Sequence, residues 1–172
     1  MERTIYLDID NALKGYKEPV KIFTDGSTIN NGKVDARGGI GIWFGEDDER
    51  NVSIAFKDKP TNQRCELMAI YHALQIANTQ IDMEIPIIIG TDSMYSINCV
   101  TKWMDNWKQN GWKTANRKDV KNKNILQNID QEYQKRKNIS FHHIRAHTKK
   151  LDEWSVGNEM ADELARNAAN YK

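Results

Sequence analysis

Cysteine is scarce in this 172-residue chain, and long apolar runs are missing from it. Cys65 and Cys99 are the only cysteines, lie far apart and form no CxxC pair. We therefore expect reduced thiols and an intracellular location. No segment approaches the ~18 consecutive apolar residues of a membrane span, so we expect no membrane partner. Residues 1–19 lack the basic start and apolar core of a secretory signal.

The length and composition are those of one globular domain. Hydrophobic residues make up 39% and charged residues 28% of the chain, and no low-complexity linker or repeat divides it. A chain of this size buries roughly 68–70% of the surface that its unfolded form exposes, so stability requires neither disulfides nor metals. We expect one domain over residues 20–172. Residues 1–19 are either a disordered leader or an additional edge strand.

The first half of the chain is typical of three strands followed by a helix. Short β-rich runs, separated by turn-rich segments, occupy residues 20–25, 38–45 and 51–57. They predict an antiparallel meander. Thr61 is a good helix cap, and the apolar residues behind it recur at helical spacing as far as about Asn78.

Strands and helices alternate in the second half. The apolar run at 85–92 predicts a strand that is covered on both faces. Ser93 can cap a short helix, and the remaining segments predict a polar helix at 122–136, a strand at 139–146 and a C-terminal helix at 158–171. The order β-β-β-α-β-α-α-β-α predicts an α/β fold. Its mixed five-stranded sheet would combine a three-stranded antiparallel meander with two parallel strands, flanked by helices.

The same Thr-Asp pair follows two of the apolar runs. FTDGST (23–28) contains Asp25, and IGTDSM (89–94) contains Asp92. For one isolated match, a simple turn explains the aspartate. Two such ends on neighbouring parallel strands would bring both carboxylates to one sheet edge, where they repel unless a cation intervenes. Mg²⁺ suits this position because it takes oxygen ligands and keeps several waters.

Positive charge is concentrated between residues 101 and 123. This segment contains seven Lys and Arg residues and two aspartates, which gives a local charge of +5. Trp103, Trp107 and Trp112 lie in the same segment. Cations interleaved with aromatics favour a polyanion that offers flat apolar surface, such as a nucleic acid. The alternative is a solvated helix with its tryptophans in the core.

Several blocks of the sequence resemble type 1 ribonuclease H, a family that cuts the RNA strand of RNA–DNA hybrids. They are FTDGS, TNQRCELMAIYHAL, TDSMYSINCVTKWMDNWKQNGWKT, HIRAH and GNEMADELA. The resemblance runs from about Val20 to Ala169, in the family's order, and ordered blocks are far more specific than a lone TDG. It implies a ribonuclease H-like fold and a monomeric endonuclease that acts on RNA–DNA hybrids with two Mg²⁺, or with Mn²⁺. The products would carry 5′-phosphate and 3′-hydroxyl ends.

Five residues would perform the chemistry, according to this resemblance. Asp25, Glu66, Asp92 and Asp162 match the metal-binding carboxylates. Two cations about 3.5–4 Å apart around a scissile phosphate need such acidic oxygens. His147 matches a mobile histidine that assists proton transfer or product release. The simpler interpretation of Glu66 and Asp162 alone is a solvated carboxylate on a helix.

Other residues would contact the two nucleic-acid strands. Asn62 and Gln63 lie near Glu66 on the predicted helix, so their amides can bond ribose 2′-hydroxyls across a minor groove. The resemblance assigns DNA contacts to Asn31, Lys59, Thr61, Trp103, Trp107 and Asn122. The family more often has Arg at the position of Lys59, and Lys lacks the bidentate fork. Residues 101–123 resemble the family's basic handle, with Lys108, Lys113 and Lys118 as its phosphate contacts.

Some alternatives stay open. A non-catalytic module on the same scaffold would bind hybrids or double-stranded RNA without cutting them. LDIDNA, which contains Asp8, resembles the start of aspartyl-phosphate phosphatases. His143 and His147 would form a zinc site only if they shared a helix. The segment TKKLDEWSVGNEM (148–160) is a longer loop than in typical family members, which affects the reach of His147.

Overall fold

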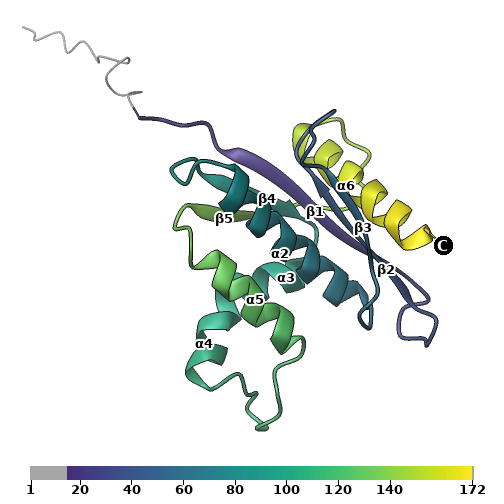
Figure 1. The fold of residues 1–172 in the computed structure, drawn as a ribbon, viewed down its shortest axis with the longest axis vertical. Helices are drawn as coiled ribbons and strands as arrows, with labels where there is room; N and C mark the ends of the chain where they lie inside the picture. The colour runs from purple at the N-terminus through teal and green to yellow at the C-terminus, as the bar shows by residue number, and fades with distance from the viewer. Residues whose placement is uncertain (1–14, 172) are drawn as a thin grey trace, which may run out of the picture.

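The computed structural model describes residues 15–171, which form a five-stranded mixed sheet with helices on its faces (Figure 1). The strand order is β3-β2-β1-β4-β5. The three antiparallel strands are β1 (Val20–Ile29), β2 (Arg37–Trp43) and β3 (Val52–Phe56). The strands β4 (Ile87–Thr91) and β5 (Ile139–His143) run parallel to β1. The predicted fold class is confirmed.

Long helices cover the two faces of this sheet. One face packs against α2 (Asn62–Gln80), which in turn packs against α5 (Lys123–Tyr133). The other face packs against α6 (Glu153–Asn170) (Figure 1). Thr61 caps α2 by accepting a hydrogen bond from the Arg64 amide, as its side-chain chemistry predicts.

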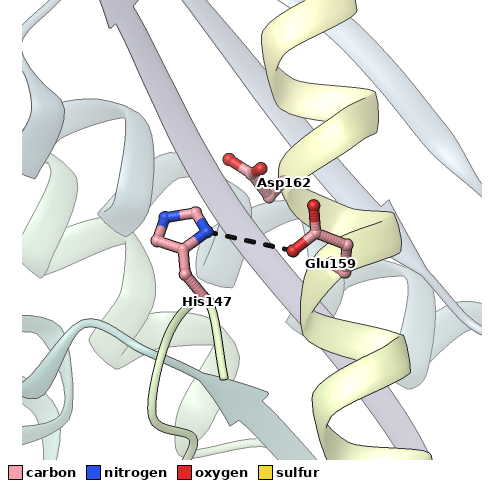
Figure 2. Close-up of side chains that lie close together, drawn as sticks. All are labelled: His147, Glu159 and Asp162. Carbon is pink, nitrogen blue, oxygen red and sulfur yellow. Dashed lines mark ion pairs between the residues drawn. The ribbon is translucent and has the colours of Figure 1, made fainter. Parts of the chain in front are cut away.

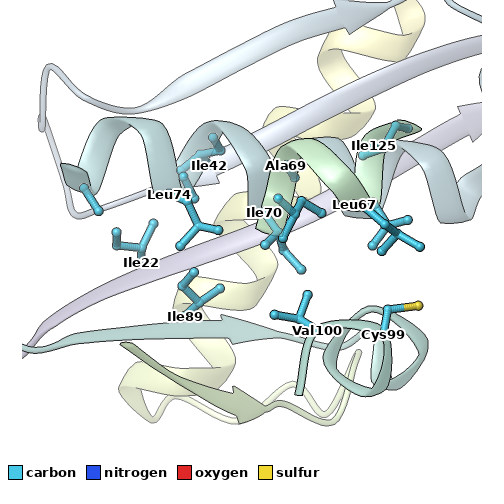
Figure 3. Packing of buried hydrophobic residues seen from close by; sticks show 14 of the residues in the cluster. Ile22, Ile42, Leu67, Ala69, Ile70, Leu74, Ile89, Cys99, Val100 and Ile125 are labelled. Carbon is cyan, nitrogen blue, oxygen red and sulfur yellow. The ribbon is translucent and has the colours of Figure 1, made fainter. Parts of the chain in front are cut away.

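The main hydrophobic core lies between the sheet and α2. Figure 3 shows Ile22 and Ile89 of the sheet facing Leu67, Ile70 and Leu74 of α2, and each of these side chains is fully buried. A smaller cluster on the other face joins Phe23, Ile144 and Ala161 with two partly buried tryptophans, Trp43 and Trp154. Both faces of β1 are therefore held by apolar packing, which keeps this strand in place relative to α2 and α6.

Two glycines let the helices approach the sheet closely. A Cβ at Gly41 of β2 would collide with the backbone carbonyl of Ala161 in α6. A Cβ at Gly26 of β1 would collide with the backbone of Cys65 and Glu66 in α2. The missing side chains thus set the distance from each helix to the central strands, and they bring Glu66 beside β1.

Three short helical segments follow β4, and the last of them extends away from the sheet (Figure 1). They are α3 (Met94–Asn98), the π-helical segment η1 (Cys99–Trp103) and α4 (Met104–Gln109). Ser93 caps α3, as predicted. A π-helical turn does not follow the 3.6-residue period of an α-helix, so the spacing of apolar residues did not predict η1.

Several element boundaries differ from the sequence-based expectation, and three of them belong to β1, β5 and α6. Strand β1 continues to Ile29 instead of ending at Asp25, because β2 pairs with its second half. Strand β5 ends at His143, short of the predicted residue 146. Helix α6 begins at Glu153, since Asp152 caps it, so most of the predicted loop at 148–160 is helical.

The cysteines and the helix lengths agree with the composition. Cys65 and Cys99 are buried and free. Within residues 15–171, we find no helix with the length and apolar character required to cross a membrane. The predicted leader (1–19) falls largely outside the described residues, as does Asp8, and the domain division stays a prediction.

Candidate active site

Asp25 and Asp92 come together through the register of two parallel strands. Phe23 of β1 lies opposite Gly90 of β4. Each aspartate stands two residues beyond this last parallel pair, at the same edge, as the Thr-Asp pattern predicts. Asp25 is 4% exposed within its strand, whereas Asp92 follows the end of β4.

Glu66 joins this pair from α2. Carboxylate oxygens of Asp25, Glu66 and Asp92 all lie within 4.8 Å of one another. The close approach of α2 to Gly26 makes this possible. Oxygens this close can share a cation, so the three side chains form one acidic cluster, here called the carboxylate cluster.

Burial and mutual repulsion raise the pKa of two members of the carboxylate cluster, Asp25 and Glu66. Burial, followed by the charge of Asp92, raises the pKa of Asp25 to about 8. Burial and then the charges of Asp25 and Asp92 raise the pKa of Glu66 well above its usual value. With a pKa of about 8, the Asp25 carboxyl is mostly neutral near pH 7 unless a cation stabilises its charged form.

One buried oxygen in this region points to a missing positive partner. The Oε2 atom of Glu66 is inaccessible to solvent and makes no hydrogen bond with the described residues. Unpaired buried carboxylate oxygens are costly. The donor set is all oxygen, which suits Mg²⁺ or Mn²⁺, so the residues present fit a hard divalent cation.

Asp162 joins the carboxylate cluster from α6. Its carboxyl is within hydrogen-bonding reach of Asp25, whose pKa it helps to raise. On the other side, the Nε atom of Arg166 stands 2.9 Å from Oδ2 of Asp162. This arginine, one helical turn away, offsets part of the negative charge. All four predicted carboxylates therefore meet at one place, and their role as metal ligands stays a prediction.

His147 lies beside Asp162 on the loop before α6. Figure 2 shows the imidazole facing Glu159 and Asp162 of that helix, and the three residues offer ligand atoms within 4.8 Å of one another. The Nδ1 atom of His147 is 3.9 Å from Oε2 of Glu159, and its side chain is 73% exposed. A hollow of about 360 Å³ opens between this loop and α6. The histidine is thus accessible and held by one weak ion pair.

The alternative zinc site is not formed by this arrangement. His143 ends β5 and places Nε2 3.2 Å from the backbone oxygen of Asp92. His147 lies in the loop that follows, so the two histidines share no helix. His143 belongs to neither of the possible metal-binding groups found in residues 15–171.

Asn158 of α6 is a site residue that the sequence reasoning missed. It is 4% exposed, and its Nδ2 atom donates to Oδ2 of Asp92 over 3.3 Å. Its Oδ1 atom is buried and finds no donor among the described residues. One signal was available, because Asn158 precedes Asp162 by four residues and so shares its helix face.

The predicted RNA contacts lie at the start of α2. Asn62 is its first residue and is exposed, while Gln63 has a buried Oε1 atom without a described partner. Thr61 and Lys59 precede them, and Lys59 adopts a left-handed backbone with φ of 49°. Thr61 is the helix cap, which leaves Asn62 unengaged in capping. Asn31 is exposed in the loop between β1 and β2.

The tryptophans of the handle form an aromatic surface that is partly in the core. The rings of Trp103 and Trp107 are 5.7 Å apart between centroids, and the Tyr95 ring lies 6.3 Å from that of Trp103, tilted by 60°. Trp103 is 39% exposed, whereas Trp107 and Trp112 pack against the main core. The core interpretation therefore holds for Trp107 and Trp112, and the nucleic-acid contact of Trp103 stays a prediction.

The other handle residues are arranged differently from one another. Asn122 donates to the hydroxyl of Tyr95 over 3.1 Å. Lys108 pairs with Asp130, and Lys113 pairs with Asp119. Lys118 is exposed and forms no ion pair with residues 15–171. Of the three predicted phosphate contacts in the handle, Lys118 is therefore the one without a competing carboxylate.

Comparison with known proteins gives consistent relatives. The family profile described as RNase H matches residues 17–170. The chain is 40% identical over 152 residues to "Ribonuclease H1" of Mus musculus, covering 88% of this chain and 50% of that protein. It is 40% identical over 152 residues to "Ribonuclease H" of Francisella philomiragia, covering 88% and 91%. The chain thus spans about half the length of the mouse relative and most of the bacterial one.

Solved structures agree on the fold. The solution structure of the RNase H domain of prototype foamy virus superposes with a TM-score of 0.71 at 23% identity. The superposition covers 90% of this chain and 96% of that domain.

Proposed function

Because the chain belongs to the RNase H family, we propose that it hydrolyses the RNA strand of RNA–DNA hybrids as an endonuclease. One observation supports this most strongly: Asp25, Glu66 and Asp92 converge within 4.8 Å, with Asp162 beside them. A member of the family without catalytic activity would not need carboxylates that are held this close together despite their repulsion.

These four carboxylates would hold the cofactor. When bound, two Mg²⁺ ions would activate the attacking water and stabilise the departing 3′ oxygen, which leaves 5′-phosphate and 3′-hydroxyl ends. The unpaired Oε2 oxygen of Glu66 is the atom that most needs such a partner. Binding of the metal would release protons, since the pKa of Asp25 is about 8 without metal.

His147 would move protons at the edge of the site. Its ring is exposed and its 3.9 Å contact to Glu159 is weak, so it can reach a phosphate above Asp162 and withdraw again. A group that is free to move suits proton transfer to the leaving oxygen or the release of product.

Residues at the start of α2 would select the RNA strand. Asn62 lies one helical turn before Glu66, so an amide faces the groove next to the scissile phosphate. Amides at this position can bond the ribose 2′-hydroxyl, which DNA lacks. Trp103 offers an exposed ring on which the sugars of the other strand can rest.

The test is cleavage of labelled substrates by the wild-type chain and by Asp92→Asn. The panel contains an RNA–DNA hybrid, double-stranded RNA, double-stranded DNA and both single strands, each with Mg²⁺ or EDTA. We expect Mg²⁺-dependent cleavage of the hybrid alone, and at least a ~10³-fold loss in Asp92→Asn while hybrid binding survives. Binding without cleavage by the wild-type chain would instead indicate the non-catalytic module.

A further inference from the structure

A second basic site lies next to the start of α2. Three lysines, Lys33, Lys57 and Lys59, line a hollow of about 410 Å³, which we call the lysine hollow. Its walls come from the β1–β2 loop and from the connection between β3 and α2, which meet at the same end of the sheet (Figure 1). The volume is within the roughly 300–1,000 Å³ of pockets that hold drug-sized ligands, so it exceeds the space of one phosphate.

The three lysines have no internal counter-charge. None of them forms an ion pair with another residue between 15 and 171, whereas Lys108 and Lys113 of the handle do. The nearest carboxylates in sequence are engaged elsewhere. Asp58 pairs with Arg64 at 2.9 Å, and Asp35 accepts a hydrogen bond from the Asn30 side chain at 2.6 Å. Exposed cations that converge without acidic partners favour an anionic ligand.

Strand β1 and helix α2 set the distance between the lysine hollow and the carboxylate cluster. From Asp25, strand β1 runs four further residues to Ile29, about 14 Å, before the loop that carries Lys33. Toward the N-terminus of α2, Asn62 lies about 6 Å along the helix axis from Glu66. Thr61 and Lys59 come just before the helix. Carboxylates, amides and cations therefore succeed one another across the surface.

This order matches a duplex that is bound across its minor groove. A scissile phosphate over the carboxylate cluster places the groove over Asn62. The B-form groove is roughly 6 Å wide and the A-form groove is wider, so a phosphate row at this distance belongs to the opposite strand. Val34 and Pro60 add apolar wall to the hollow, which suits deoxyribose better than a sugar with a 2′-hydroxyl.

We propose that Lys33 and Lys57 extend the DNA path beyond Lys59 and Thr61, so that the lysine hollow binds successive phosphodiesters of the DNA strand. This inference rests on the proposed function. It assigns a ligand to two lysines that the sequence did not single out, on two connections that are brought together only by the fold.

The experiment measures binding of a labelled hybrid as a function of salt in the non-cleaving Asp92→Asn background. We expect Lys33→Ala/Lys57→Ala to weaken binding about three- to tenfold near 0.1 M salt and to reduce the slope of log affinity against log salt by about 1 to 2. The matched control is Lys137→Ala, an exposed lysine before β5 at the opposite end of the sheet, which should keep both values.

A second hybrid, whose DNA strand carries neutral methylphosphonates opposite the hollow, identifies the strand. Its binding should no longer differ between the background and the double variant. An unchanged salt slope in the double variant would overturn the proposal, and so would a loss that persists on the neutral DNA strand. If the Asp92→Asn protein bound no hybrid and the wild-type chain cleaved none, the proposed function itself would be wrong.

Discussion

At the scale of single residues, the site depends on side chains that offset the negative charge of its carboxylates. Asp25 and Glu66 are crowded by buried negative neighbours, while Arg166 and Asn158 supply nearby donors for Asp162 and Asp92. The hydrogen bond from Asn158 to Oδ2 restrains the orientation of the Asp92 carboxylate. We infer that Asn158 positions Asp92 for metal binding.

Asn158→Ala tests this positioning role. We expect Mg²⁺ affinity to fall roughly 10- to 100-fold, as is usual when an outer hydrogen-bond partner of a ligand is lost. Isothermal titration with Mg²⁺ or Mn²⁺ gives the affinity directly, without reference to activity. The control is Asn167→Ala, an exposed position on the same helix. Equal affinities in both variants would show that Asn158 is only a packing residue.

At the scale of elements, the end of α2 is fixed by one buried arginine. Arg136 follows α5 and is 4% exposed. Its guanidinium donates to four backbone carbonyls at and beyond the end of α2, those of Ala77, Ile81, Asp82 and Ile85. A helix end leaves such carbonyls without partners, so Arg136 replaces a C-terminal cap and joins α2 to α5.

Arg136→Met should therefore destabilise the fold. The substitution keeps apolar volume but leaves several carbonyls buried without donors, which costs about 3–5 kcal/mol of the free energy of unfolding. Urea denaturation followed by circular dichroism measures this loss. Lys137→Met, on the exposed neighbouring residue, should change stability by less than about 0.5 kcal/mol. A similar small effect at Arg136 would contradict the capping role.

At the scale of the whole molecule, the carboxylate cluster destabilises the metal-free fold, although the proposed function requires it. In the absence of metal, Asp25 loses its proton at about pH 8 in the folded chain, compared with about 3.8 when unfolded. Between these values, the folded state binds more protons than the unfolded state, so the free energy of unfolding falls as pH rises. A bound cation removes the penalty, which makes the metal a folding partner of this sheet edge.

Thermal unfolding at pH 6 and pH 8, with EDTA or with Mg²⁺, measures this linkage. The wild-type chain in EDTA should be less stable at pH 8, and Mg²⁺ should raise its Tm more at pH 8 than at pH 6. Asp25→Asn should unfold about 3–10 °C higher in EDTA at pH 8, because an amide carries no buried charge. Asp105→Asn, exposed on α4, is the control. A pH dependence in Asp25→Asn equal to that of the wild type would sink this explanation.

The sequence by itself determined the order of elements and much of the site. Short β-rich and apolar runs predicted all five strands, and the helical spacing of apolar residues predicted α2, because both patterns are local. The Thr-Asp pairs predicted that Asp25 and Asp92 meet, since parallel strands end at one edge. Capping residues were equally local: Thr61 and Ser93 begin their helices as predicted. Asp152 carried the same signal for α6 and was overlooked.

Tertiary structure alone decided the rest. The length of β1 depends on pairing with β2, and the closeness of Glu66 depends on the missing side chain of Gly26. Neither Asn158 nor the lysine hollow has a motif, because their partners lie on other elements. Local sequence specifies backbone preference and buried faces, whereas the distances between side chains from different elements arise only when those faces pack together.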